Sequence, residues 1–381
     1  MFSVHQHWDP LKTCIVGSSY PPKFYDYIKN DKIKKVFYRI AEETEEDYQT
    51  LIAKLKSFGV EIFRTEIDPD FSVYFNGHSF LPPPMTPRDH TAMIGNVWFT
   101  AEDSHFKNHW EVVRGSDWPD LPKNKLEFDA LPDFIKEECT NEFGIHSFND
   151  LIMNNGLEQI NNFIQYQGNK LKKGTFINSA MCSRVGKDLY FGTDENDRNK
   201  NLKVLKHKYS QLFPNYRCHI VDSEGHADSV YCPVVPGLIM SIVDMPSYQD
   251  TFPGWEVVYI KNESWNKVKP FLTLKQKNQG KWWVPGEELN DDFTNYVESW
   301  MNHWVGYVEE TVFDINMLVI DKKNVICNNY NKLVFDTFSR YGITPHIVNF
   351  RHRYFWDGGL HCITSDVHRE GIREDFFPER G

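Results

Sequence analysis

Short apolar runs separated by tight turns recur along this chain, always in the same order. A polar residue is followed by a strand, a turn, a second strand, a helix and a third strand. The clearest copy follows Asn316, with strands expected at 317–320, 325–327 and 343–348 and a helix at 333–341. This order of elements is a ββαβ module.

Four other stretches follow the same order. Copies begin at Asp89, Asn178 and Asp228, each with two strands joined by a tight turn. The copy nearest the N-terminus is less complete, with a strand over 13–16 and a helical stripe before a strand over 60–64. No such unit can bury its apolar face alone, so five copies indicate a closed ring of α/β modules.

Two stretches, roughly 101–175 and 261–305, fall outside the repeat and are rich in aromatic and charged residues. We interpret them as ordered insertions in one domain spanning 1–381.

The composition narrows the choice of partners. The 381 residues are 40% hydrophobic and carry a net charge of −11, with acidic and basic residues interspersed. This balance argues against nucleic acid and against an anionic membrane surface as partners. No apolar run has the roughly 18 to 20 residues of a membrane helix, and the N-terminus does not resemble a signal peptide. We therefore expect a soluble, cytoplasmic protein.

The seven cysteines are scattered and show no C-x-x-C spacing. An odd total without paired spacing indicates neither a disulfide framework nor a structural zinc site. We expect buried thiols, one of which is reactive.

Polar residues stand at the start of three modules. Equivalent positions in a ring face a common axis, so Asp89, Asn178 and Asp228 are expected to converge on one site. Any one of them alone is more simply explained as a turn residue. Three at matching places favour a shared function.

Two further residues are candidates for chemistry. Cys362 follows a pair of glycines that permits close approach of the backbone to a ligand, which makes it the best candidate nucleophile, although a lone cysteine is more often a small buried hydrophobe. His226 stands two residues before Asp228, and both side chains would share a face if the backbone were extended. An imidazole in this position can move a proton to or from an amine.

These segments resemble the amidinotransferases, typified by arginine:glycine and inosamine-phosphate amidinotransferases. The resemblance rests on Gly225-His-Ala-Asp228, on 358–371 with its Gly-Gly-Leu-His-Cys-Ile-Thr, and on Pro87-Arg-Asp89, and it extends from about residue 8 to 371. It implies the pentein fold, an α/β-propeller of five pseudo-symmetric ββαβ modules around a central active site.

The resemblance also implies residue roles. Cys362 would take an amidino group from a guanidino donor such as arginine, and His226 would protonate the departing amine. Asp89 and Asp228 would bind the guanidinium. An amine acceptor such as glycine would then remove the group in a ping-pong scheme. We expect small-molecule donor and acceptor as partners and no cofactor; family members are often dimers, so a homodimer is also expected.

Two positions depart from the family pattern. Asn178 stands where the family has an aspartate that holds the histidine, and an amide supplies no charge there. Met245 stands where the family has an arginine that meets the donor carboxylate. A decarboxylated or bulkier guanidino donor therefore becomes plausible.

Three other interpretations stay open. A guanidino hydrolase would let water attack in place of an amine, and a non-catalytic guanidine-binding protein would need no covalent step. A zinc site made of His226, Asp228, His361 and Cys362 has suitable ligand types. Neighbouring residues such as His361 and Cys362 would, however, point to opposite faces of an extended strand, so we expect no metal.

Overall fold

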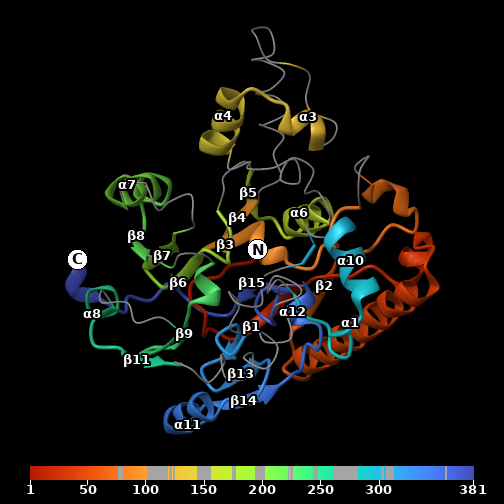
Figure 1. Cartoon of the computed structure of the whole chain (residues 1–381). Helices are drawn as coiled ribbons and strands as arrows, with labels where there is room; N and C mark the ends of the chain where they lie inside the picture. The colour runs from red at the N-terminus through yellow and green to blue at the C-terminus, as the bar shows by residue number, and fades with distance from the viewer. Residues whose placement is uncertain are drawn as a thin grey trace.

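The computed structural model describes residues 1–75, 80–100, 119, 122, 125–143, 156–173, 177–193, 202–221, 223, 226–242, 248–260, 282–301, 304–305, 313–356 and 358–381. The described residues form five three-stranded sheets arranged around a common centre (Figure 1). In every sheet the first and second strands are antiparallel, and the second and third are parallel. The predicted ring of α/β modules is confirmed.

The strands of each sheet are as follows. The sheets are β15 (Thr364–Arg369), β1 (Leu11–Val16) and β2 (Glu61–Arg64); β3 (Thr91–Ile94), β4 (Val97–Thr100) and β5 (Lys170–Lys173); β6 (Cys182–Val185), β7 (Asp188–Gly192) and β8 (Arg217–Val221); β9 (Tyr231–Val235), β10 (Leu238–Ser241) and β11 (Glu256–Tyr259); and β12 (Leu318–Asp321), β13 (Asn324–Cys327) and β14 (Thr344–Ile347).

Helices connect the second and third strands because a parallel pair needs a crossover. The α-helices are α1 (Asp31–Ser57), α3 (Lys125–Asp129), α4 (Asp133–Phe143), α6 (Leu157–Tyr166), α7 (Leu202–Leu212), α8 (Tyr248–Thr251), α10 (Asp291–Trp300), α11 (Lys332–Tyr341) and α12 (Arg353–Trp356). Five short 3₁₀ helices are also described: Pro22–Tyr27, Phe71–Tyr74, Pro87–Asp89, Ala227–Ser229 and Pro378–Arg380. Helices α1, α7 and α11 lie on the outside of the ring (Figure 1).

The α11 module shows how local sequence produces the unit. Asn331 caps the helix by accepting hydrogen bonds from the backbone N–H groups of Leu333 and Val334. Gly342 ends it at φ 68°, in the left-handed region that favours glycine. Phe338, on the buried face of the helix, packs with the apolar side chains of the neighbouring strands. The unit thereby buries its apolar faces only inside the ring.

The two ends of the chain close the ring together. β15, near the C-terminus, pairs antiparallel with β1, near the N-terminus, and Ile15 lies opposite Ser365. The segment before β1 also bridges to other modules, with Val4 opposite Gly95 and Gln6 opposite Val185. The incomplete first copy of the repeat is therefore completed by β15, from the other end of the chain.

The module that begins at Asp89 extends further than predicted. Its helix α6 and third strand β5 lie inside the stretch 101–175 that we interpreted as an insertion, and β5 pairs parallel with β4. The side chains of β5 are exposed or only half-buried, so its sequence, Lys-Leu-Lys-Lys, lacks the apolar pattern by which a strand is predicted.

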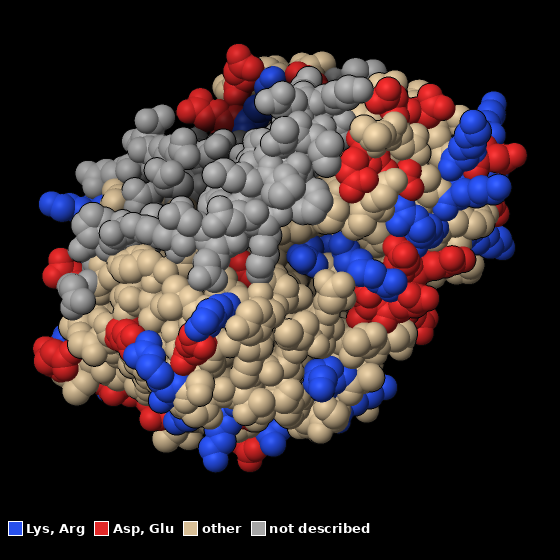
Figure 2. Space-filling model, turned by 60° about the horizontal axis from the view of Figure 1, so that its bottom comes forward, with Lys and Arg blue, Asp and Glu red and all other residues tan. Residues whose placement is uncertain are grey.

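Two features of the described surface bear on partners. Lysine and arginine side chains are interspersed with aspartate and glutamate on the face shown in Figure 2. Among the described helices, none is both long and apolar enough to cross a membrane.

Candidate active site

Each first strand is preceded, two to four residues before it begins, by a residue with a polar or thiol side chain. These five residues are Asp89, Asn178, Asp228, Asn316 and Cys362. The fivefold arrangement brings the loops together although they are far apart in the sequence. Cys362 thus occupies, in the module closed by β15, the position that carboxylates and amides occupy in the others.

Hydrogen bonds join the loops around the centre. Ser179 N–H donates to the carbonyl of Arg88 at 3.0 Å, and Asp228 N–H donates to the carbonyl of Ala180 at 3.1 Å. The buried Arg88 guanidinium donates from Nε to the carbonyl of His361 at 2.9 Å. These contacts hold the loops of Asp89, Asn178, Asp228 and Cys362 in one rigid group.

The thiol of Cys362 is buried, with 6% of the residue exposed. Asn316 Nδ2 lies 2.9 Å from Sγ, and Asp228 Oδ2 lies 3.8 Å from it. Burial raises the pKa of Cys362 well above its usual value, and the negative charges of Asp228 and Asp89 raise it further. Only the Gly359 backbone and the Asn316 amide act to lower it, so the resting thiol is protonated at neutral pH.

His361 contacts the same carboxylate as Cys362. Its Nδ1 lies 2.7 Å from Asp228 Oδ2. Burial, together with the charge of Arg88, lowers the pKa of His361 to about 4 despite the opposing effect of Asp228. At neutral pH the ring is therefore neutral, and Nδ1 carries the proton that it donates to the carboxylate.

The carboxylate of Asp228 stays ionised. Its burial acts to raise the pKa, but the hydrogen bond from His361 and the nearby positive charges outweigh this and lower it.

The expectation that His361 and Cys362 point to opposite faces is wrong. Both lie in a turn before β15 rather than in an extended strand, and a turn lets both side chains approach Asp228. Within the described residues, no group of three or more histidine, cysteine, aspartate or glutamate side chains is arranged to hold a metal.

His226 lies beside the other carboxylate of the site. Its Nδ1 is 3.9 Å from Asp89 Oδ1, and 45% of the histidine side chain is exposed. The backbone here is not extended, because His226 precedes the 3₁₀ helix Ala227–Ser229. The two side chains differ in exposure: Asp228 is buried, whereas the side chain of His226 is exposed.

Two predicted site residues remain, Asn178 and Met245, and the structure describes only the first. Asn178 is buried, and its Oδ1 accepts a hydrogen bond from the backbone N–H of Met181 at 2.8 Å. The amide oxygen thus stabilises its own loop. Met245 lies outside the described residues.

The glycine pair before Cys362 has a structural reason. A Cβ on Gly359 would lie 2.5 Å from Asn316 Oδ1 and 2.8 Å from a ring atom of Phe313. Only a residue without a side chain lets Asn316 come this close to the turn. The close approach is therefore to a protein amide, whereas we expected one to a ligand.

Gly359→Ala is expected to displace Asn316 and to destabilise the protein by about 1–3 kcal/mol. Gly358→Ala is the matched control, because its Cβ would meet only ordinary contacts at 3.4–3.5 Å. Urea unfolding of both variants tests this. Equal loss of stability in the two would show that the approach of Asn316 to Gly359 is not a packing constraint.

A buried ionic cluster lies beneath the site. Asp366 accepts hydrogen bonds from Arg88 at 3.1 Å, Arg184 at 2.8 Å and Arg369 at 2.6 Å, and all four side chains are inaccessible or nearly so. Arg88 also holds the carbonyls of His361 and Thr364. The cluster thereby supports the turn that carries Cys362.

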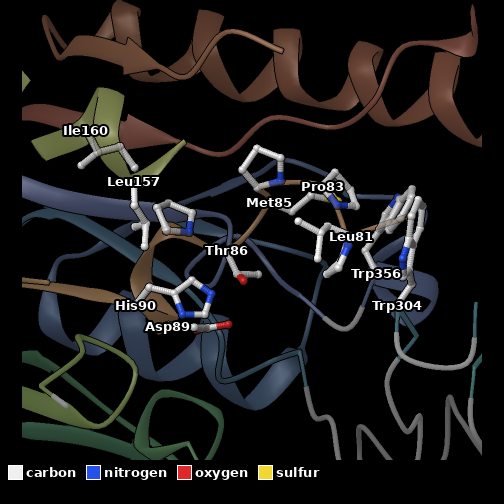
Figure 3. A pocket seen from close by; sticks show the side chains of 13 residues that line it. Leu81, Pro83, Met85, Thr86, Asp89, His90, Leu157, Ile160, Trp304 and Trp356 are labelled. Atoms are coloured by element: carbon white, nitrogen blue, oxygen red, sulfur yellow. The ribbon is translucent and has the colours of Figure 1, made fainter. Parts of the chain in front are cut away.

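A pocket of about 250 Å³ opens beside Asp89 (Figure 3). Asp89, Thr86 and His90 are its polar side, and the indoles of Trp304 and Trp356 lie across from them. The rest of the lining is apolar: Leu81, Pro82, Pro83, Pro84, Met85, Pro87, Leu157 and Ile160. The indole N–H groups are already engaged, by the carbonyl of Phe80 and by Thr44 Oγ1, and proline has no N–H.

The roles of three residues that contact the site's candidates were not predicted from the sequence. His361 was considered only as a possible zinc ligand, and Arg88 only as part of the segment Pro87-Arg-Asp89. Asn316 was recognised only as the start of a module, although it precedes a first strand as Asp89 and Asp228 do and the same inference applied to it.

Comparison with known proteins identifies relatives over nearly the whole chain. Glycine amidinotransferase of Xenopus tropicalis, a mitochondrial protein, is 22% identical over 406 aligned positions, covering 98% of this chain and 84% of the relative. Glycine amidinotransferase of Gallus gallus is 23% identical with the same coverage. Inosamine-phosphate amidinotransferase 1 of Streptomyces griseus is 20% identical, and 97% of each chain is covered. No family model matches the chain.

Solved structures agree in fold. An amidinotransferase of the saxitoxin biosynthetic pathway from Microseira wollei superimposes with a TM-score of 0.60 at 16% identity, and 99% of each chain is covered. The inosamine-phosphate amidinotransferase of Streptomyces griseus gives 0.59 at 16% identity with equal coverage. The resemblance stated from the sequence is confirmed: the chain is similar over nearly its whole length to amidinotransferases and shares the fold of their solved structures.

Proposed function

We propose that this protein is an amidinotransferase that carries the amidino group on Cys362. The observation that carries the proposal is a buried thiol 3.8 Å from the ionised carboxylate of Asp228, with a second carboxylate, Asp89, beside His226. Two carboxylates near a thiol suit a planar cation with several N–H donors, such as a guanidinium.

The reaction proceeds in two halves. Once the donor is bound, the proton of the Cys362 thiol passes to His226. The thiolate attacks the guanidino carbon, the C–N bond to the leaving amine breaks, and His226 gives that amine the proton. The amidino group remains on sulfur as a cation facing Asp89 and Asp228. An acceptor amine then attacks the same carbon, His226 takes its proton, and the C–S bond breaks to return the thiolate.

The donor is proposed to lack a carboxylate. The pocket beside Asp89 presents apolar side chains and indole faces whose N–H groups are engaged. An ionised carboxylate would lose hydration there, and apart from the indoles the only described lining side chains that can donate a hydrogen bond are those of Thr86 and His90, beside the negative Asp89. Agmatine, which is arginine without its carboxylate, is thus expected to be the better donor by about tenfold or more in kcat/KM.

The test is intact-protein mass after incubation with agmatine or arginine and acid quenching. A mass gain of one amidino group is expected, lost when an amine acceptor is added. Ammonia or urea released without an acceptor would instead establish the hydrolase. Unchanged donors and no adduct, with binding detected by calorimetry, would overturn the proposal in favour of a guanidine-binding protein.

The pH dependence of turnover tests the role of the donor cation. Because burial and two carboxylates raise the pKa of Cys362 in the free protein, kcat/KM is expected to rise with pH through the neutral and alkaline range. A guanidinium bound between Asp89 and Asp228 offsets their charge and favours the thiolate. The midpoint of the kcat profile should therefore lie below that of kcat/KM, and coincident midpoints would contradict this activation.

The homodimer and the cytoplasmic location stay predictions. Size-exclusion chromatography with light scattering tests the first, and fractionation of source cells tests the second.

A further inference from the structure

The amide of Asn316 is held in one orientation by the turn that carries the candidate nucleophile. Its Oδ1 accepts hydrogen bonds from the backbone N–H groups of His361, at 2.9 Å, and Cys362, at 3.2 Å. A backbone N–H can only donate, so the atom facing both must be the oxygen. The NH₂ group of the amide is consequently the one that faces Cys362 Sγ, at 2.9 Å.

Neighbouring residues prevent the amide from turning. Asn328 Nδ2 donates to the backbone carbonyl of Asn316 at 2.6 Å, and Asn328 Oδ1 accepts from the backbone N–H of Leu360 at 3.2 Å. Gly359 packs against the amide so closely that a Cβ there would clash with it. Asn316 itself is 1% exposed, so water does not compete for its NH₂ group.

A thiolate at Cys362 needs donors, because its surroundings are negative. Asp228 and Asp89 both disfavour the anion, and burial removes water from it. A donor fixed on the sulfur stabilises the thiolate more than the thiol. The NH₂ group of Asn316 stays in place after the amidino group has left, when the positive charge of that group no longer offsets the negative charges of Asp228 and Asp89.

We propose that Asn316 is a positioning residue that stabilises the Cys362 thiolate through Nδ2 while its Oδ1 holds the turn of residues 360–362. This inference deepens the proposed function and rests on Cys362 being the nucleophile. Asn316 precedes its first strand as Asp89 and Asp228 precede theirs. In this proposal the carboxylates of Asp89 and Asp228 bind the cationic donor, and the amide of Asn316 stabilises the anionic thiolate.

Asn316→Asp separates the two roles. The aspartate keeps an oxygen for the two backbone N–H groups but replaces the donor to sulfur with an anionic oxygen. The readout is the rate of iodoacetamide alkylation at Cys362, followed by peptide mass spectrometry from pH 6 to 10.5 without donor. Because the pKa of the Cys362 thiol is raised, the alkylation rate in this range is proportional to the thiolate fraction. At a given pH the rate should fall about tenfold or more, which corresponds to a rise in pKa of about one unit.

Asn331→Asp is the matched control. Asn331 is an equally buried asparagine that caps α11, where aspartate serves as well, and it has no contact with Cys362 among the described interactions. Its alkylation profile should match the wild type. If Asn316→Asp does not fold, Asn316→Ala serves instead, with an expected rise of about one unit from loss of the donor.

The outcomes separate this inference from the proposed function. An unchanged alkylation rate at Cys362 in the folded Asn316 variant would overturn the inference and leave only a structural role in the turn. The alkylation assay needs no substrate, so it reports on Asn316 whether or not an amidino adduct forms. Loss of the adduct in wild-type protein would overturn the proposed function alone.

Discussion

Cys362→Ala is expected to abolish the amidino adduct and to lower turnover by roughly 10⁴-fold or more, because no other group replaces a nucleophile that forms the covalent bond. Donor binding should persist, since Asp89 and Asp228 are unchanged. In this variant the donor is expected to contact both carboxylates, but no thiol is present to attack it. Intact-protein mass and calorimetry on the same samples measure the two effects.

Cys218→Ala is the control for this variant. Cys218 is a buried cysteine on β8, in a different module from Cys362, and burial raises the pKa of its thiol to about 11. Its adduct and turnover should match the wild type. An adduct that survives Cys362→Ala and disappears in Cys218→Ala would move the covalent step to another thiol and refute the assignment.

Asp366→Asn is expected to destabilise the protein by about 3–5 kcal/mol. Removing this charge leaves Arg88, Arg184 and Arg369 buried without the carboxylate that joins them. Turnover should fall in the fraction that stays folded, since Arg88 also holds the carbonyl of His361. Urea unfolding monitored by tryptophan fluorescence gives the free energy of unfolding.

The pH dependence of this effect has a defined sign. Although burial acts to raise the pKa of Asp366, the three arginines lower it well below its usual value in the folded protein. The stability that the carboxylate contributes is fully present above the unfolded pKa of about 3.9 and is lost as the pH falls below it. The difference between wild type and variant should therefore shrink in acid.

Asp336→Asn is the matched surface control. Asp336 pairs with Lys332 on α11, and both side chains are largely exposed, so its loss should cost about 1 kcal/mol or less. If both variants lost equally little stability at neutral pH, the buried cluster would not be needed for folding.

The sequence predicted the repeat well because each module carries its own signals. Apolar strands, a tight turn and an amphipathic helix are local features, and the module after Asn316 has all of them within about thirty residues. The prediction failed where those signals were weak. Strand β5 reads Lys-Leu-Lys-Lys, and it is recognised only by its parallel pairing with β4.

The candidate site was predicted in part for a related reason. Asp89, Asn178 and Asp228 each precede a first strand, so the symmetry of the repeat indicated a common site, whereas Cys362 was chosen for its glycine pair and for the family resemblance. Symmetry does not specify which atoms meet. The pairing of His226 with Asp89, and of His361 with Asp228, depends on a short 3₁₀ helix and a turn that alternation alone did not predict.

The sequence by itself determined the number of modules, most of their strands and the residues at the starts of four of them, because hydrophobic spacing and turn residues act over a few positions. The tertiary structure alone decided that β15 completes the first module, that Asn316 directs its amide at Cys362, and that Asp366 joins three arginines beneath the site. These contacts link residues up to hundreds of positions apart. Their geometry exists only once the ring has closed and excluded water from its centre.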